Sequence, residues 1–309
     1  MTIAEQNRPM GRLLLIIAFI AFISLGLPDG LLGVAWPSMS TSFNVDLSVL
    51  SVALVAGTIG YMVSTVLSGK LVALLGIGRL LALSSFLTAS ALIAYTIIPS
   101  FVIVLGCVVI AGFGGGAIDA GVNIYITEKY RKMLYWLHAM FGIGTTIGPF
   151  VMTASLNIST WRLGYLLVGS FQLVLAAIFL LTADRWEMVS SPSETETEAS
   201  STQPGLRETL RIPATWFSIL LFMLYAGLEV SFGQWSFSIF SEGRGIDANL
   251  AGYFVGVYWG SFTVGRILSS FIVMRVPERR YLRFGMGMAL VGALLMWWNP
   301  FPMIGLLGL

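Results

Sequence analysis

The sequence predicts an all-α protein that crosses a membrane many times, and three observations support this. Of its 309 residues, 57% are hydrophobic and only 10% are charged, whereas a soluble domain carries roughly 25% charged residues. The apolar residues fall in runs of about 20, the length that a helix needs to cross a bilayer. The runs are solidly apolar, unlike the alternating strands of a membrane β-barrel. These observations exclude a soluble enzyme, a nucleic-acid-binding module and a disordered protein.

Each apolar run is expected to be a helix, because backbone exposed to lipid must satisfy its own hydrogen bonds. The first six runs predict an N-terminal six-helix bundle (1–183), and the remaining runs predict an incomplete C-terminal bundle (213–309) with three spans and the start of a fourth. The nine spans are expected near 12–36, 48–69, 80–98, 101–125, 134–155, 162–183, 214–239, 249–273 and 282–299.

The two bundles are joined by a polar segment, 184–212, which is rich in Ser, Thr and Glu. It is too polar to bury a core, so we expect a disordered cytoplasmic linker. A last apolar run, 303–309, follows Pro302 and is too short to span a membrane. We therefore expect that the chain is truncated at its C-terminus, with a last segment that lies at the membrane interface as the alternative.

The positions of Lys and Arg predict the orientation of the helices. With the N-terminus in the cytoplasm, 14 of the 17 basic residues fall on the cytoplasmic side, and only Arg162 and Arg244 fall outside. The remaining one, Arg266, lies within a span. Cytoplasmic loops carry an excess of Lys and Arg, so we expect a multi-pass protein of the inner (plasma) membrane with a cytoplasmic N-terminus.

The two bundles are also related by a weak internal repeat. With a shift of 200 residues, Asp29 aligns with Glu229 and Gly33 aligns with Gly233 without gaps. Both copies begin on the same side, so the repeat is parallel. Parallel six-helix halves are one construction of membrane transporters, with the substrate site between the halves near the middle of the membrane.

Charged residues inside spans are costly and point to function. Four are present: Asp29, Asp119, Glu229 and Arg266. Asp119 shares one helix face with Gly112, Gly116 and Asn123, because residues three and four apart lie on the same side of a helix.

Glycines on the Asp119 face allow another helix or a ligand to approach closely. Burial disfavours the charged form of a carboxyl group, so a carboxyl group in such a place can exchange a proton near neutral pH. The sequence therefore predicts Asp119 as a proton-coupling residue, with a locked structural carboxyl group as the alternative. His138, the only histidine, is a candidate partner at similar depth, or a histidine satisfied by a backbone carbonyl group.

A group of polar and aromatic residues is predicted to bind the solute. The segment 26–30 contains Pro28, which removes a helical hydrogen bond, so we expect a broken helix that presents Asp29 to the solute, with a role in packing or gating as the alternative. Amides, carboxylates and aromatic faces together suit a ligand with many hydroxyl groups. The alternative for the aromatic residues is the aromatic belt of the membrane interface. The predicted solute-binding residues are Asp29, Asn123, Glu229, Gln234, Trp235, Tyr258 and Trp259.

Three motifs resemble those of the major facilitator superfamily. The loop 68–79 resembles its loop signature, with Gly69 and Arg79 in place and Ala73 where the family has an acidic residue. The segment 144–149 resembles its Gly-x-x-x-Gly-Pro kink motif, with Gly144, Gly148 and Pro149. The resemblance implies structural or gating roles for these residues, to which we add Arg266.

Spans four and five are similar to the fucose:proton symporter branch of this superfamily. The matching segments are 119–123, which begins with Asp119 and ends with Asn123, and 136–144. In that branch a carboxylate of span four carries the proton and an Asn follows four residues later, which implies these roles for Asp119 and Asn123. The resemblance also implies a twelve-helix protein, of which about two and a half helices are missing here.

We therefore expect a monomeric secondary transporter in the lipid bilayer that moves a small polar solute, most simply a sugar, together with protons by alternating access. Two alternatives are efflux of amphipathic compounds and a receptor or scaffold that does no transport. The sequence contains one Cys and one His, and it shows no nucleophile–base pair or metal-ligand spacing. We expect no enzymatic activity, no metal, no cofactor and no nucleic-acid partner.

Overall fold

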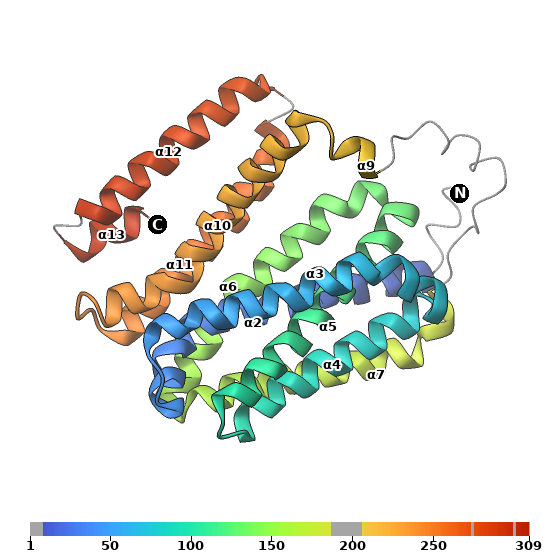
Figure 1. The fold of residues 1–309 in the computed structure, drawn as a ribbon, viewed down its shortest axis with the longest axis horizontal. Coiled ribbons are helices and arrows are strands. Elements are labelled where there is room, and N and C mark those ends of the chain that lie inside the picture. Colours follow the sequence, from blue (N-terminus) through green and yellow to red (C-terminus); the bar gives the residue numbers. More distant parts are fainter. Residues whose placement is uncertain (1–8, 187–205, 273–274, 299–300, 309) are drawn as a thin grey trace.

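A computed structural model describes residues 9–186, 206–272, 275–298 and 301–308, and these residues form helices joined by short turns, without a strand (Figure 1). The first set of long helices comprises α2 (Pro9–Phe43), α3 (Leu50–Leu75), α4 (Ile77–Ile97), α5 (Phe101–Lys129), α6 (Leu134–Ile158) and α7 (Trp161–Leu181). The second set comprises α10 (Pro213–Ser241), α11 (Ala248–Ile272), α12 (Glu278–Trp298) and the short α13 (Pro302–Gly308). Single helical turns lie at η1 (Leu47–Val49), η2 (Arg131–Met133), η3 (Ala183–Arg185) and α9 (Leu206–Thr209).

The described helices confirm the all-α membrane architecture. Eight of them are long and apolar enough to cross a membrane. The ninth predicted span, 249–273, forms α11, which has 25 residues but lies outside that group of eight. It includes Asn249 and Arg266, which lower its hydropathy. Within the predicted linker, residues 187–205 lie outside the described residues, so the disorder expected there stays a prediction.

The prediction that the first helix is broken at Pro28 is wrong. Helix α2 is continuous over 35 residues and contains both Pro28 and Pro37. Proline removes the hydrogen bond to the carbonyl group four residues earlier, which for Pro28 is the carbonyl group of Ser24. That oxygen is 3.4 Å from the side-chain nitrogen of Gln172 on α7, which donates to it. A neighbouring helix thus supplies the missing donor, as is common for prolines in membrane helices.

Glycines bring several helices into close backbone contact. Along α2 and α6, a Cβ on Gly148 would stand 2.7 Å from the Cα of Gly30, and Gly144 lies directly against Ile23 and Gly26. Along α3 and α5, Gly112 lies against Gly57 and Gly60 lies against Val109. Small residues are the usual means by which membrane helices approach. These two seams fix the positions of the side chains that project between the helices.

Two buried clusters occupy opposite ends of the molecule. We call the end near Pro9, Lys129 and Pro213 the linker end, and the other the Phe43 end. The cluster at the Phe43 end combines both sets of helices, because it contains Trp36 and Met39 of α2 with Phe237 and Phe240 of α10.

The cluster at the linker end is built differently. Its buried residues, which run from Leu14 to Trp186, all belong to the first set of helices or, for Tyr130 and Trp186, to the turns that follow α5 and α7. Toward the Phe43 end, Asn157 of α6 also donates a hydrogen bond of 2.5 Å to Asn249 of α11. The two sets of helices therefore pack against each other from the Phe43 end as far as the contact of Gly142 and Thr146 with Thr263, and the linker-end cluster does not join them.

Candidate functional site

Asp119 projects from α5 toward α3. Its position follows from the glycine seam, because Gly116 lies one turn before Asp119 and is in contact with the backbone of Tyr61 and with Ser64 on α3. Ser64 is fully buried beside it. The predicted helix face of Gly112, Gly116 and Asp119 thus packs on a neighbouring helix, as expected from its glycines.

Both oxygens of the Asp119 carboxyl group accept hydrogen bonds. The Tyr61 hydroxyl group donates to Oδ2 at 2.5 Å, and the Asn123 side-chain nitrogen donates to Oδ1 at 2.8 Å. The O–H···O⁻ bond of a charged acceptor has a typical length of 2.5–2.7 Å. Asp119 is half-buried, and its two hydrogen-bond partners are neutral.

His138 lies near Asp119 on α6. It is within electrostatic reach of the Asp119 carboxyl group and also of Arg266. Its ring makes an edge-on contact with Phe22, with ring centroids 5.8 Å apart. The structure therefore brings together the two residues predicted to couple protons, without a hydrogen bond between them among the described contacts.

Asp29 lies where the two sets of helices meet. Gln234 of α10 donates to its backbone oxygen at 2.9 Å. One turn further along α2, a Cβ on Gly33 would stand 2.9 Å from the backbone oxygens of Gly233 and Gln234. Gly33 and Gly233 are equivalent positions of the internal repeat, so equivalent positions of the repeat meet at the interface. The Asp29 side chain is exposed although Tyr61 and Glu229 are within electrostatic reach of it.

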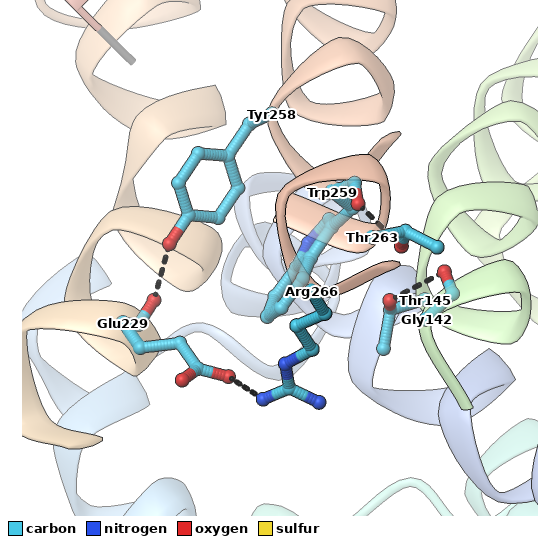
Figure 2. A network of polar contacts seen from close by, with 7 residues as sticks. All are labelled: Gly142, Thr145, Glu229, Tyr258, Trp259, Thr263 and Arg266. Carbon is cyan, nitrogen blue, oxygen red and sulfur yellow. Dashed lines mark hydrogen bonds and ion pairs between the residues drawn. The ribbon is translucent and has the colours of Figure 1, made fainter. Parts of the chain in front are cut away.

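Glu229 and Arg266 form an ion pair within the second set of helices. Their closest atoms, Oε1 and Nη2, are 3.3 Å apart, and Figure 2 shows both side chains between α10 and α11. The guanidinium group also stands 4.2 Å from the centre of the Phe262 ring, a cation–π contact. Tyr258 donates to the Glu229 backbone oxygen at 2.9 Å.

The central charges are unequally compensated. Glu229 has Arg266 as its cation. No ion pair is recorded for Asp29 or Asp119 among the described residues. The first set of helices therefore presents two carboxyl groups without an ion pair among the described residues, beside a second set with a balanced pair.

The aromatic residues predicted to bind the solute lie in or against the buried cluster at the Phe43 end. Tyr258 and Trp259 are buried in the cluster at the Phe43 end, where Trp259 packs directly on Gly233. Trp235 is half-buried and packs against the same cluster. Gln234 is also buried. Gln234 bonds directly to the first set of helices through the Asp29 backbone oxygen, and the three aromatic side chains belong to or pack against the cluster that contains both sets. Their contact with a solute stays a prediction.

The residues predicted to have structural or gating roles also separate into groups. Gly144 and Gly148 form the seam with α2, and Pro149 lies beside Gly30 in that seam. Arg79 forms an exposed ion pair of 3.4 Å with Asp184. Gly69 has open space beside it.

Tyr61 is the residue of this site that the sequence did not indicate. A single Tyr within an apolar span has no distinguishing pattern. The available signal was the pair Gly57 and Gly60, three residues apart, which resembles the pair Gly112 and Gly116, four residues apart. Tyr61 directly follows Gly60, which contacts α5.

The described surface has two shallow hollows of about 430 and 270 Å³, and both lie at the Phe43 end. Ser38 of α2 lines both, and neither is lined by Asp29, Asp119 or Glu229.

Comparison with known proteins decides the family. The sequence profile of the Major Facilitator Superfamily matches residues 14–309. The chain belongs to this superfamily. Membership places it among multi-pass membrane transporters and not among enzymes, and it agrees with the helical architecture in Figure 1.

Several members of the superfamily are similar to this chain at low identity. Bypass of stop codon protein 6 of Saccharomyces cerevisiae is 23% identical, over 89% of this chain and 60% of the relative. Sodium-dependent glucose transporter 1 of Homo sapiens is 22% identical, over 81% and 55%. The glucose/mannose transporter GlcP of Bacillus subtilis is 21% identical, over 85% and 67%. The chain thus spans between about half and two thirds of the length of these relatives.

Proposed function

We propose that this protein is a secondary transporter that moves a sugar together with protons, and that Asp119 is the group that carries the proton. The names of the relatives support a sugar as the solute, since two of those described above are glucose transporters. The observation that carries the proton assignment is the surroundings of Asp119, whose carboxyl oxygens contact a phenol and an amide and no cation.

The unpaired carboxyl groups near the centre of the protein support transport in which a cation moves together with the solute. Asp29 and Asp119 have no ion pair among the described residues, and a neutral sugar brings no charge to compensate them. Unpaired charges in a medium of low dielectric constant are unfavourable, so positive charge should enter with the solute.

The packing between the two sets of helices supports alternating access. They are joined by the cluster at the Phe43 end, whereas the linker-end cluster contains the first set alone. We assign the closed side of this conformation to the Phe43 end. The distribution of Lys and Arg supports a linker end in the cytoplasm, with the protein in the plasma membrane. In the other conformation, the contacts of Gly33 and Asn157 with the second set would separate.

The proposal is tested with Asp119→Asn, which keeps the shape of the side chain but cannot exchange a proton. We expect that this variant loses uphill accumulation of labelled glucose, mannose or galactose, while solute exchange across the membrane continues. Asp46→Asn is the matched control, because Asp46 is an acidic residue in the turn at the Phe43 end and makes no side-chain cap hydrogen bond.

Three results would contradict the proposal. Accumulation by Asp119→Asn at the wild-type level would exclude the proton role. Accumulation that follows an imposed sodium gradient and ignores the pH gradient would assign the coupling to sodium. Drug sensitivity of cells that lack the protein, with normal uptake of all three sugars, would support the alternative of efflux.

A further inference from the structure

The hydrogen bonds of Asp119 determine which of its oxygens can carry a proton. The Asn123 side-chain nitrogen donates both to Oδ1 of Asp119, at 2.8 Å, and to its backbone oxygen, at 3.0 Å. A backbone oxygen can only accept, so the group that faces Asp119 must be the NH₂ of the amide. An NH₂ group cannot accept a proton from Oδ1. The proton must therefore bind to Oδ2, opposite Tyr61.

A tyrosine hydroxyl group is suited to this position because it can both donate and accept. When Asp119 is ionised, the Tyr61 hydroxyl group donates to Oδ2, as the structure shows. When Oδ2 is protonated, the new O–H group donates to the Tyr61 oxygen, and the hydrogen of Tyr61 turns to another acceptor. Asp119 thus keeps a hydrogen bond in both states, and Tyr61 changes the direction in which it donates.

The other acceptor for the Tyr61 hydrogen, once Oδ2 of Asp119 is protonated, is sought among the groups near the interface between the two sets of helices. Tyr61 is about one-third exposed, and Asp29 of α2 is within electrostatic reach of it. The other titratable group that faces Asp119 is His138 of α6. The charged residue of α4 is Arg79, which lies in the first turn of that helix and pairs with Asp184. The Tyr61 hydroxyl group is therefore a donor on a partly exposed side chain that interacts electrostatically with Asp29, one of the residues that the sequence predicts to bind the solute.

The close backbone contact between α3 and α5 fixes the position of the Tyr61 side chain relative to Asp119. A Cβ on Gly116 would stand 2.5 Å from the backbone oxygen of Tyr61, so the two backbones touch at the residue that carries the hydroxyl group. Gly112 and Gly60 make similar contacts one turn away. The two helices cannot move apart or slide without loss of these contacts, which keeps the phenol against Oδ2 while its hydrogen turns.

We propose that Tyr61 is the positioning residue that links the proton to the solute, and this rests on the proposed function of Asp119. A proton from water binds to Oδ2, and Tyr61 then donates its hydrogen to a hydroxyl oxygen of the sugar beside Asp29. On release, the proton leaves Oδ2 for water and Tyr61 donates again to the carboxylate. No other bond forms or breaks.

The first test measures how the affinity for the solute depends on pH. In the wild-type full chain, the half-saturating concentration for exchange of labelled glucose, mannose or galactose should be about five- to tenfold lower at pH 6 than at pH 8, the effect of about one hydrogen bond. In Tyr61→Phe the two values should agree within twofold. Tyr253→Phe, an exposed tyrosine on α11, is the matched control and should behave as the wild type. A wild-type pH dependence in Tyr61→Phe would overturn the proposal.

The second test needs no solute and no transport. Infrared difference spectra between low and high pH should show the C=O band of protonated Asp119 in the wild type and no such band in Asp119→Asn. In Tyr61→Phe the band should move to the frequency of a carboxylic acid without a hydrogen-bond acceptor. An unmoved band in Tyr61→Phe would overturn this inference and leave the role of Asp119 intact. A missing band in the wild type would overturn the proposed function itself.

Discussion

The ion pair between Glu229 and Arg266 leads to a prediction about asymmetry. Replacement of Arg266 by Gln leaves the Glu229 carboxylate without its cation and with Asp29 within electrostatic reach. Replacement of Glu229 by Gln leaves the guanidinium group with the Phe262 ring at 4.2 Å. The loss of Arg266 should therefore destabilise the protein more than the loss of Glu229, although both changes remove the same contact.

The magnitude follows from the exposure of the pair. The side chain of Arg266 is 34% exposed and that of Glu229 is 14% exposed. Exposed pairs contribute about 0.2–1 kcal/mol, and the removal of one partner from a buried pair costs about 3–5 kcal/mol. For this partly screened pair we expect a loss of about 2 kcal/mol for Arg266→Gln, and less than about 1 kcal/mol for Glu229→Gln because the cation keeps its aromatic contact.

The assay is a double-mutant cycle on the free energy of unfolding in detergent. Arg266→Gln, Glu229→Gln and the double variant are compared with the wild type at one pH and one salt concentration. The double variant should be more stable than Arg266→Gln alone, because no uncompensated carboxylate remains at position 229. Equal losses for the two single variants, or a greater loss for Glu229→Gln, would refute this view of the central charges.

Two further predictions concern close contacts between helices. Gly33→Ala should weaken the packing at the Phe43 end, because its Cβ would stand 2.9 Å from two backbone oxygens of α10. Chemical labelling of cysteines introduced near Phe43 should therefore increase. The control Gly227→Ala, with open space beside it, should show wild-type labelling. Gly148→Ala should lower stability by about 1–3 kcal/mol through overpacking against α2, measured by thermal unfolding; Gly106→Ala has no neighbour within 4 Å, and an equal loss in both variants would count against the seam.

The helical architecture was predictable because it depends on composition and run length alone. The predicted first span, 12–36, is shorter than α2, which extends from Pro9 to Phe43. The polar residues after Pro37 ended the apolar run, but Ser40 and Thr41 bond back to the Pro37 carbonyl group. Hydroxyl groups that bond back to the chain in this way are satisfied within a helix, so the end of the apolar run did not mark the end of α2.

The candidate site was predictable only in part. Asp119 and Asn123 share a helix face, which helical periodicity determines, so their contact was accessible from the sequence. The contact of Asp119 with Tyr61 joins residues 58 positions apart and depends on which helices pair. Trp259 was expected near the solute because it lies beside polar residues, but it is buried against Gly233. The composition of a helix does not reveal which neighbour covers each face.

A measurement of proton movement during sugar uptake is the most direct test of the central claim. Purified full chain is placed in vesicles without any gradient, a sugar is added outside, and a pH dye reports the medium. We predict that glucose, mannose or galactose makes the outer medium alkaline for the wild type, because each sugar molecule carries protons inward, and that Asp119→Asn gives no change. A signal of wild-type size from Asp119→Asn, or sugar entry into wild-type vesicles without any change of pH, would contradict the claim.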